Sequence, residues 1–417
     1  MKKLLFTVAV TSALLASAAP SIDPSTVAMT QDPSSRKVTV AYTLSGEAAI
    51  VTLDIETNVT DGVWASIGQQ NLTYVSGAAN RLVTTLGTPS YIYWQPTKAW
   101  PNMDVAAGNI RAVVRAWSKS SPPDYMAVDL HVSSNRTYYA AKEAVPGGVT
   151  NRLYKTDVML MRRIPAAGVR WRMGSPTNEV GRSNARENLH YVQLSDDYYM
   201  GVYPVTQAQY LLLADTSVNP SNYTGAERDI HPVERVSYTN IRGSSWPTGL
   251  HDDVASGSVV AKARALTGLK LDLPTDAQWE YACRAGEGAA MYDGNSLTNA
   301  TTDAHADALA WYGFGWGGNT TTTMPVGLKP ANNWGLYEMY GNTFDWTLDW
   351  FVETPYAYGS DVTDPVGPSS GTSNQRSLRG GSYNYKSERC RSAHRANCSD
   401  SAQPFAGFRL VCPAFEP

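Results

Sequence analysis

Short runs in which apolar and polar residues alternate fill the first third of the chain, and they restrict this part to a sheet-based fold. The runs are Lys37–Leu44, Ala49–Glu56, Tyr91–Gln95, Asn109–Trp117 and Met126–Val132. A period of two is typical of strands that bury one face, and Gly, Asn, Pro and Ser separate the runs. No helical period interrupts them before about residue 135. We therefore predict an immunoglobulin-like or fibronectin-like β-sandwich over residues 27–133.

The pattern changes after a connector, which we place at residues 134–155. In LPTDAQWEYACRAG, Thr275 can cap a helix, Gln278 completes a capping box, and Gly286 follows the last turn. Long stretches rich in Gly, Asn, Thr and Trp surround this helix, and such loops are usually functional or held by ligands or metals. We predict that residues 156–413 form a domain with few helices and long loops. The fold class is thus α+β with an all-β N-terminal domain.

The first residues have the pattern of a secretory signal peptide. Lys2 and Lys3 form a basic start, an apolar run follows to Ala16, and small residues stand at the expected cleavage site. The apolar run is too short to span a bilayer, so we expect no membrane span. We predict a signal peptide at residues 1–18 and an exported protein, periplasmic or secreted.

The four cysteines are Cys283, Cys390, Cys398 and Cys412. An even number in an exported protein favours two disulfides, with three possible connectivities. Cys390 also lies within RGGSYNYKSERCRSAHR, where nearby cationic side chains would favour a reactive thiolate. The residues alone leave both interpretations open.

Composition and histidine placement exclude some classes of function. The net charge of -3 gives no electrostatic footprint for nucleic acid, so we expect no nucleic-acid partner. The six histidines are scattered, with no pair at helical ligand spacing, which argues against a histidine-clustered zinc or iron site.

A possible calcium site lies in NNWGLYEMYGNTFDWTLDW. Glu338 and Asp345 flank Gly341 and Thr343, where the chain has to turn tightly. Two carboxylates and exposed carbonyls in a turn are the hard oxygen ligands that calcium takes. The alternative is a capped turn whose acids bind backbone amides.

Six blocks of residues, in order, resemble the sulfatase-modifying factor family, whose enzymes are the formylglycine-generating enzymes. The blocks are GVYPVTQAQY, HPVERVSY, LPTDAQWEYACRAG, GLYEMYGN, FDWTLDWF and RGGS…RSAHR…GFRLV. They fall between Met159 and Val411 and do not reach the N-terminal domain. The resemblance implies a variant of the C-type lectin fold.

The resemblance also implies a copper site and a chemistry. Formylglycine-generating enzymes hold copper between two cysteines that follow the RGGS block, and they oxidise a sulfatase cysteine to formylglycine. Ser382 matches the family serine, Cys390 matches the second cysteine, and Tyr385 stands where the first would be. Paired thiolates suit Cu(I) and a phenol does not, so we expect the two-cysteine copper chemistry to be absent.

Further site assignments follow from the resemblance. The family calcium ligands correspond to Glu338, the carbonyls of Gly341 and Thr343, and Asp345. Relatives without the copper pair suggest a Cys283–Cys390 disulfide, which leaves Cys398 and Cys412 for each other.

Three classes of function follow. One is an exported oxidase of the formylglycine-generating type acting on a sulfatase, with Cys390, Ser382 and Tyr385 as catalytic candidates. Another is a lectin-like binding protein of the retroelement-diversified type. The third is an unknown chemistry in the same scaffold. We expect an exported protein that binds or acts on an extracellular polypeptide or glycan, with Ser382, Tyr385, Arg391 and His394 as ligand-binding residues.

Overall fold

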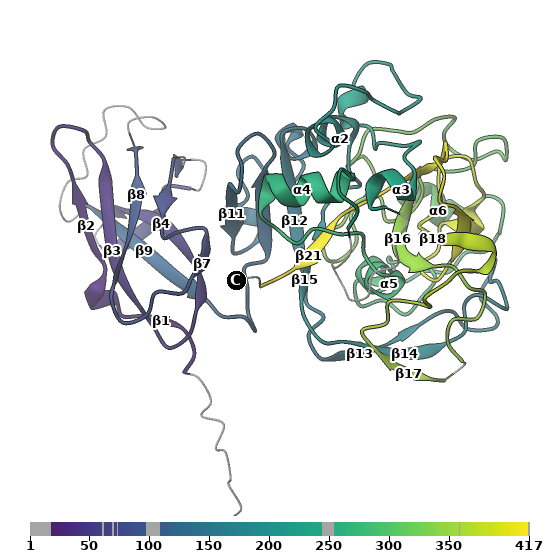
Figure 1. Cartoon of the computed structure of the whole chain (residues 1–417), viewed down its shortest axis with the longest axis horizontal. Helices are drawn as coiled ribbons and strands as arrows, with labels where there is room; N and C mark the ends of the chain where they lie inside the picture. Colours follow the sequence, from purple (N-terminus) through teal and green to yellow (C-terminus); the bar gives the residue numbers. More distant parts are fainter. Residues whose placement is uncertain are drawn as a thin grey trace, which may run out of the picture. The chain divides into compact units, whose positions relative to one another are not determined.

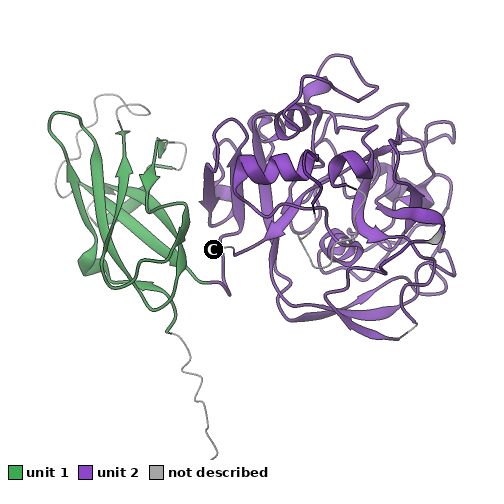
Figure 2. Cartoon of the chain, viewed as in Figure 1, with its two compact units in different colours: residues 1–118 green, residues 119–417 purple. Residues whose placement is uncertain are grey.

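The computed structural model (Figure 1) describes residues 18–60, 62–68, 71–72, 74–96, 109–243, 254–357 and 359–415. The chain divides into two compact units between Ser118 and Lys119 (Figure 2). The predicted signal peptide lies, except for Ala18, outside the described residues. None of the helices in the described part has the length and apolar character that crossing a bilayer requires.

The first unit contains two antiparallel sheets. One has the order β1–β3–β8–β6 with β2 beside β3, and the other has the order β5–β4–β7 with β9 beside β4. The strands are β1 (Ser21–Ile22), β2 (Ala28–Gln31), β3 (Val38–Ser45), β4 (Ala49–Thr60), β5 (Val63–Ser66), β6 (Ser76–Gly77), β7 (Arg81–Val83), β8 (Pro89–Trp94) and β9 (Ile110–Trp117).

The two sheets of the first unit share one apolar core. In β3 every second residue from Val38 to Leu44 is buried, as the alternating pattern predicts. Val51, Leu53 and Ile55 of β4 reach the same core from the other sheet. The immunoglobulin or fibronectin type of this arrangement stays a prediction.

The boundary between the units differs from the prediction. The run Met126–Val132, which we assigned to the sandwich, supplies β10 (Tyr125–Asp129), and β10 pairs with β12 (Val158–Ile164) in the second unit. The predicted connector contains β11 (Arg136–Tyr139), which pairs with β10. Local alternation identifies a strand but not its partner, because pairing is decided by distant residues.

The second unit is mostly β, with a few short helices. Its sheets have the orders β11–β10–β12–β15–β21, β13–β14–β17 and β19–β18–β16–β20. The further strands are β13 (Val169–Met173), β14 (His190–Leu194), β15 (Tyr198–Gly201), β16 (Phe344–Trp350), β17 (Asp361–Thr363), β18 (Gln375–Arg379), β19 (Ala396–Ser399), β20 (Ala406–Gly407) and β21 (Val411–Pro413).

The helices of the second unit begin at polar caps. They are α2 (Gln207–Leu213), α3 (Tyr238–Ile241), α4 (Val259–Thr267), α5 (Asp276–Arg284) and α6 (Ala304–Leu309). The predicted capping box of α5 is confirmed, with Thr275 and Gln278 satisfying each other's backbone amides. All nine residues of α5 are buried, among them Asp276, Glu280 and Arg284. Buried charges on a helix require partners. Arg284 pairs with Glu280 on the same helix, and arginines of the C-terminal segment pair with Asp276 and Glu280.

Candidate functional site

The segment Arg379–Arg395 leads from β18 to β19 and contains all of the predicted catalytic and ligand-binding residues. It begins with Gly380 and Gly381, which have φ values of 92° and 80° that other residues rarely adopt. A Cβ on Gly381 would lie 2.9 Å from the sulfur of Cys390, and one on Gly380 would lie 3.1 Å from the ring of Trp279. The glycines therefore allow the segment to pack directly onto the core.

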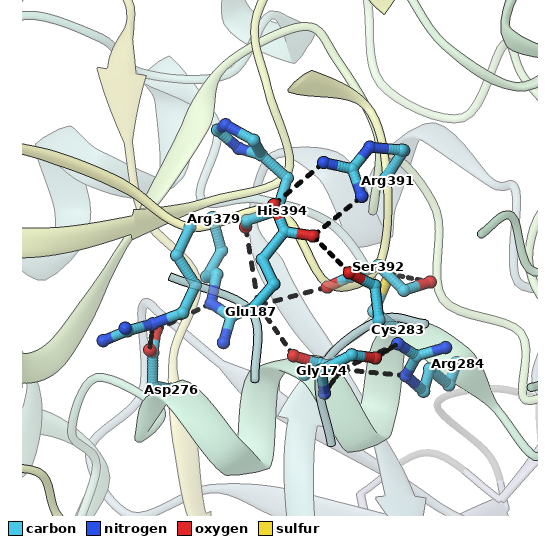
Figure 3. Close-up of polar contacts among 12 residues, drawn as sticks. Gly174, Glu187, Asp276, Cys283, Arg284, Arg379, Arg391, Ser392 and His394 are labelled. Atoms are coloured by element: carbon cyan, nitrogen blue, oxygen red, sulfur yellow. Dashed lines mark hydrogen bonds and ion pairs between the residues drawn. The ribbon is translucent and has the colours of Figure 1, made fainter. Parts of the chain in front are cut away.

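Arg391 is a buried clamp and not a surface ligand. Its Nη1 and Nη2 donate to Glu187 Oε2 and Oε1 at 2.9 Å each, and Nη1 also donates to Glu179. Nη2 donates to the carbonyl of Gly181 at 2.7 Å, and Nε to that of Glu388 at 2.9 Å. The side chain is fully buried, and Figure 3 shows its contact with Glu187. Because its charge is already matched inside the protein, these contacts argue against the predicted ligand-binding role of Arg391.

His394 is also buried, which argues against its predicted ligand-binding role. Arg389 Nη1 donates to His394 Nε2 at 2.8 Å, and Nδ1 has no hydrogen-bond partner. Burial and then the neighbouring arginines, Arg389 and Arg391, hold the pKa of His394 well below its usual value. The ring is therefore neutral and packs inside the domain.

Ser382 is fully buried as well, and its Oγ donates to Asn384 Oδ1 at 2.8 Å. This burial argues against the predicted ligand-binding role of Ser382. Tyr385 differs, because its side chain is only partly buried. Its ring packs edge-on against Phe344 and Phe405, each at 5.3 Å between centroids. Among the predicted ligand-binding residues, Tyr385 alone is not buried.

None of the four cysteines forms a disulfide in the structure, so neither predicted pairing is present. Cys398 lies on β19 and Cys412 on β21, in different sheets. Cys283 instead donates to Ser392 Oγ at 3.7 Å (Figure 3). An even number of cysteines does not say which of them lie close together in the fold, so the count alone could not predict the pairs.

Cys390 does not have the environment of a reactive cysteine. Burial raises its pKa to about 12, and burial raises the pKa of Cys283 to about 12 as well. The neighbouring cation that suggested an activated thiol, Arg391, is paired with Glu179 and Glu187. Both thiols are therefore protonated at neutral pH.

An aromatic surface beside Tyr385 was missed from the sequence. We call Phe314, Trp316, Tyr383 and Lys386 the aromatic face. Phe314 is 50% exposed and Trp316 is 51% exposed. Phe314 lies 6.5 Å from Tyr383 between ring centroids, and Lys386 Nζ lies 4.3 Å from the ring centroid of Trp316. The available signal was the run GFGWGG, in which two aromatics alternate with glycines.

Backbone hydrogen bonds hold the aromatic face in place. The amide of Gly313 donates to the carbonyl of Tyr385, and the amide of Phe314 donates to the carbonyl of Tyr383, each at 2.8 Å. Two loops that are distant in sequence are thereby joined along their backbones. Exposed aromatics on fixed loops are suited to binding, because little conformational entropy is lost when a ligand docks.

The predicted calcium ligands lie in and beside a tight turn. Glu338, Gly341 and Asn342 all have positive φ, at 47°, 70° and 61°. Glu338 and Asp345 are each 2% exposed, and Glu338 Oε2 and Asp345 Oδ1 have no hydrogen-bond partner. The other oxygen of Asp345 accepts from Arg409 at 2.7 Å and from Trp279 at 2.9 Å.

The donor set of this turn fits a hard cation. Burial raises the pKa of Glu338 to about 7, a cost that a bound cation would remove. No three His, Cys, Asp or Glu side chains in the described part of the chain gather as a metal site. Backbone carbonyls, such as those of Gly341 and Thr343, would therefore have to complete the coordination.

A second buried network ties the C-terminal segment to α5. Arg379 donates to Asp276 at 2.7 Å and to Glu280 at 3.0 Å, and Arg395 donates to Asp276 at 2.6 Å (Figure 3 shows the Arg379 contacts). Asp349 accepts from the backbone amide of Asp276 at 2.8 Å. Burial and the neighbouring Asp276 raise the pKa of Asp349 to about 8.

We expect Asp349→Asn to remove part of the pH dependence of stability. The pKa of Asp349 is raised from 3.8 to about 8. The free energy of unfolding is therefore highest at low pH, where the carboxyl is neutral, and it falls as pH rises through that interval. Asparagine can still accept the Asp276 amide but cannot ionise. In thermal melts across this interval, the melting temperature of the variant should increase relative to that of the wild type as pH rises. Parallel curves for the two proteins would contradict this account.

The fold and the site define a mostly-β domain with few helices, whose C-terminal segment is held to a central helix by buried ion pairs. Residues 163–414, more than half of the chain, match the family described as "Sulfatase-modifying factor enzyme 1-like domain". The chain belongs to this family.

Known proteins and solved structures are also similar to this chain. The formylglycine-generating enzyme of Streptomyces coelicolor is 33% identical over 197 residues, which are 42% of this chain and 60% of that enzyme. The formylglycine-generating enzyme of Mus musculus is 27% identical over 323 residues, 67% of this chain and 82% of the relative. The solved Treponema denticola variable protein 1 is 24% identical with a TM-score of 0.49, covering 61% of this chain and 95% of its own.

Proposed function

We propose that the second unit binds an extracellular polypeptide through the aromatic face and does not use two-cysteine copper chemistry. The observation that carries this proposal is the pair of half-exposed rings, Phe314 and Trp316, held beside Tyr383 by backbone hydrogen bonds. Isolated exposed apolar residues are common, but aromatics gathered on fixed loops are typical of binding surfaces.

The chemistry of the available ligands supports the proposed absence of two-cysteine copper chemistry. Cu(I) prefers a pair of thiolates, whereas this chain offers the phenol of Tyr385 and the thiol of Cys390. Burial raises the pKa of Tyr385 above its ordinary value, and it raises that of Cys390 to about 12. A formylglycine-generating oxidase is the second candidate, and it is favoured by the names of the relatives that are similar to this chain.

The polypeptide proposal can be tested with immobilised peptide and glycan arrays probed with the full protein. We expect peptide binding that falls at least about tenfold in a Phe314→Ser/Trp316→Ser double variant, a loss of about 1.4 kcal/mol. Val218→Ser is the matched control, because Val218 is 71% exposed but lies outside the aromatic face. Unchanged binding by the double variant, or binding to glycans alone, would contradict the proposal.

We also propose that calcium stabilises the turn of Glu338, Gly341, Thr343 and Asp345, where two buried carboxylate oxygens have no partner. Removing calcium with a chelator should then lower the melting temperature by several degrees. An ion present at about 100 times its Kd contributes about 2.7 kcal/mol. Glu338→Gln keeps an acceptor for Gly327 N–H and should lose the response to chelator. A wild-type melt that does not change with chelator and added calcium would remove this assignment.

Export completes the proposed function. It is supported by the basic start, apolar run and small residues of residues 1–18. N-terminal sequencing of protein recovered outside the cytoplasm should begin after Ala18, whereas an intact Met1 in that fraction would contradict cleavage.

A further inference from the structure

A pocket of about 270 Å³ opens beside the aromatic face and is not part of the predicted site. Tyr383 lines it and also belongs to the aromatic face. The other lining residues are Asn222, Tyr223, Thr224, Gly225, Glu234, Thr322 and Thr323. Sites for drug-sized molecules have volumes of about 300–1,000 Å³, so this pocket has the size for a single side chain or small group.

The pocket contains an unmatched carboxylate. Glu234 is 2% exposed, its Oε1 accepts from the backbone amide of Asn222, and its Oε2 has no hydrogen-bond partner. Burial raises the pKa of Glu234, and the backbone amides of Asn222 and Tyr223 offset this effect only in part. None of the ion pairs in the described part of the chain involves Glu234. The adjacent Arg235 is exposed and donates to Asn222 Oδ1 at 3.1 Å. A buried carboxylate oxygen without a partner is costly, and a ligand that donates to it would remove this cost.

The rest of the pocket favours an organic cation over other ligands. Among the described residues that line it there is no lysine or arginine, and Tyr223 and Tyr383 contribute aromatic rings. Tyr223 stacks on His231 at 3.7 Å between ring centroids. Burial lowers the pKa of His231 to about 4. The imidazole is therefore neutral at neutral pH and places no positive charge behind Tyr223. Carboxylate, aromatic rings and hydroxyl groups together are the partners of an ammonium or guanidinium group.

We propose that this pocket binds the positively charged side chain, lysine or arginine, of the polypeptide held on the aromatic face, with Glu234 as its counter-charge. The proposal rests on the proposed function, because Tyr383 connects the two surfaces, and it adds the chemical class that the ligand must contain. A divalent metal fits less well, since calcium takes 6–8 oxygen ligands and Glu234 is the only carboxylate among the described lining residues.

The pocket can be tested alone with N-acetyl-lysine methylamide and N-acetyl-arginine methylamide, using saturation-transfer NMR on the full protein. We expect at least one of them to bind, and Glu234→Gln to weaken it by about tenfold or more. The glutamine side chain would keep an acceptor for the Asn222 amide, so the variant should fold with an unchanged melting temperature. Glu143→Gln, at an exposed position in the same unit, is the control for loss of one charge.

The outcomes separate this inference from the proposed function. If neither cationic probe binds, or if Glu234→Gln binds them as tightly as the wild type, the pocket assignment is wrong. The peptide array still tests the aromatic face in that case. If the neutral N-acetyl-norleucine methylamide binds equally well, charge recognition is excluded. Binding of the cationic probes without any peptide binding would support the pocket and contradict the proposed function.

Discussion

Arg391→Ala is expected to lower the free energy of unfolding of the second unit by about 3–5 kcal/mol, which is the usual effect of removing one partner of a buried ion pair. The reason is that Glu187 and Glu179, 0% and 3% exposed at their side chains, would lose their cation. The carbonyls of Gly181 and Glu388 would lose donors as well. Urea unfolding followed by tryptophan fluorescence measures the change.

Two neighbouring variants sharpen this prediction. Arg391→Lys keeps the charge but cannot donate in parallel to both oxygens of Glu187, so it should fall between alanine and the wild type. Lys386→Ala removes a cation that lies on the aromatic face of the same segment and should leave the unfolding midpoint nearly unchanged. If Arg391→Ala unfolded at the same urea concentration as Lys386→Ala, Arg391 would not be a buried clamp and a ligand-binding role would be open again.

Features of the fold that depend on residues close together in the sequence could be predicted. Thr275 and Gln278 form a capping box because both partners lie within one helical turn. The alternation from Val38 to Leu44 predicts which side of β3 is buried. The unit boundary could not be predicted, since β10 has the pattern of a sandwich strand and only its pairing with β12 places it in the second unit.

The candidate site was harder to predict, because its contacts join residues that lie far apart in the chain. Arg391 looked like a surface cation in a basic segment, yet Glu187, its partner, precedes it by 204 residues. Burial cannot be read from the sequence of such a segment. For Phe314 and Trp316, exposure was the feature that the sequence did not predict, because aromatic residues are more often in the core than at the surface.

We also expect the protein to lack the copper-dependent oxidation of a substrate cysteine. A two-cysteine copper site requires two thiolates within reach of one ion. Tyr385 occupies one of the two positions, and the Cys390 thiol is fully buried with a pKa raised to about 12. Binding copper there would require removing a tightly held proton and opening the packed core, without a second soft ligand.

The most direct test of this account is aldehyde formation on a cysteine-containing sulfatase peptide, incubated with the purified protein, copper and oxygen. The account predicts no aldehyde above that of a Cys390→Ser control, by mass spectrometry and by reaction of the peptide with an aminooxy probe. Repeated turnover by the wild type that is lost in Cys390→Ser would contradict it, and would identify the protein as an oxidase despite Tyr385.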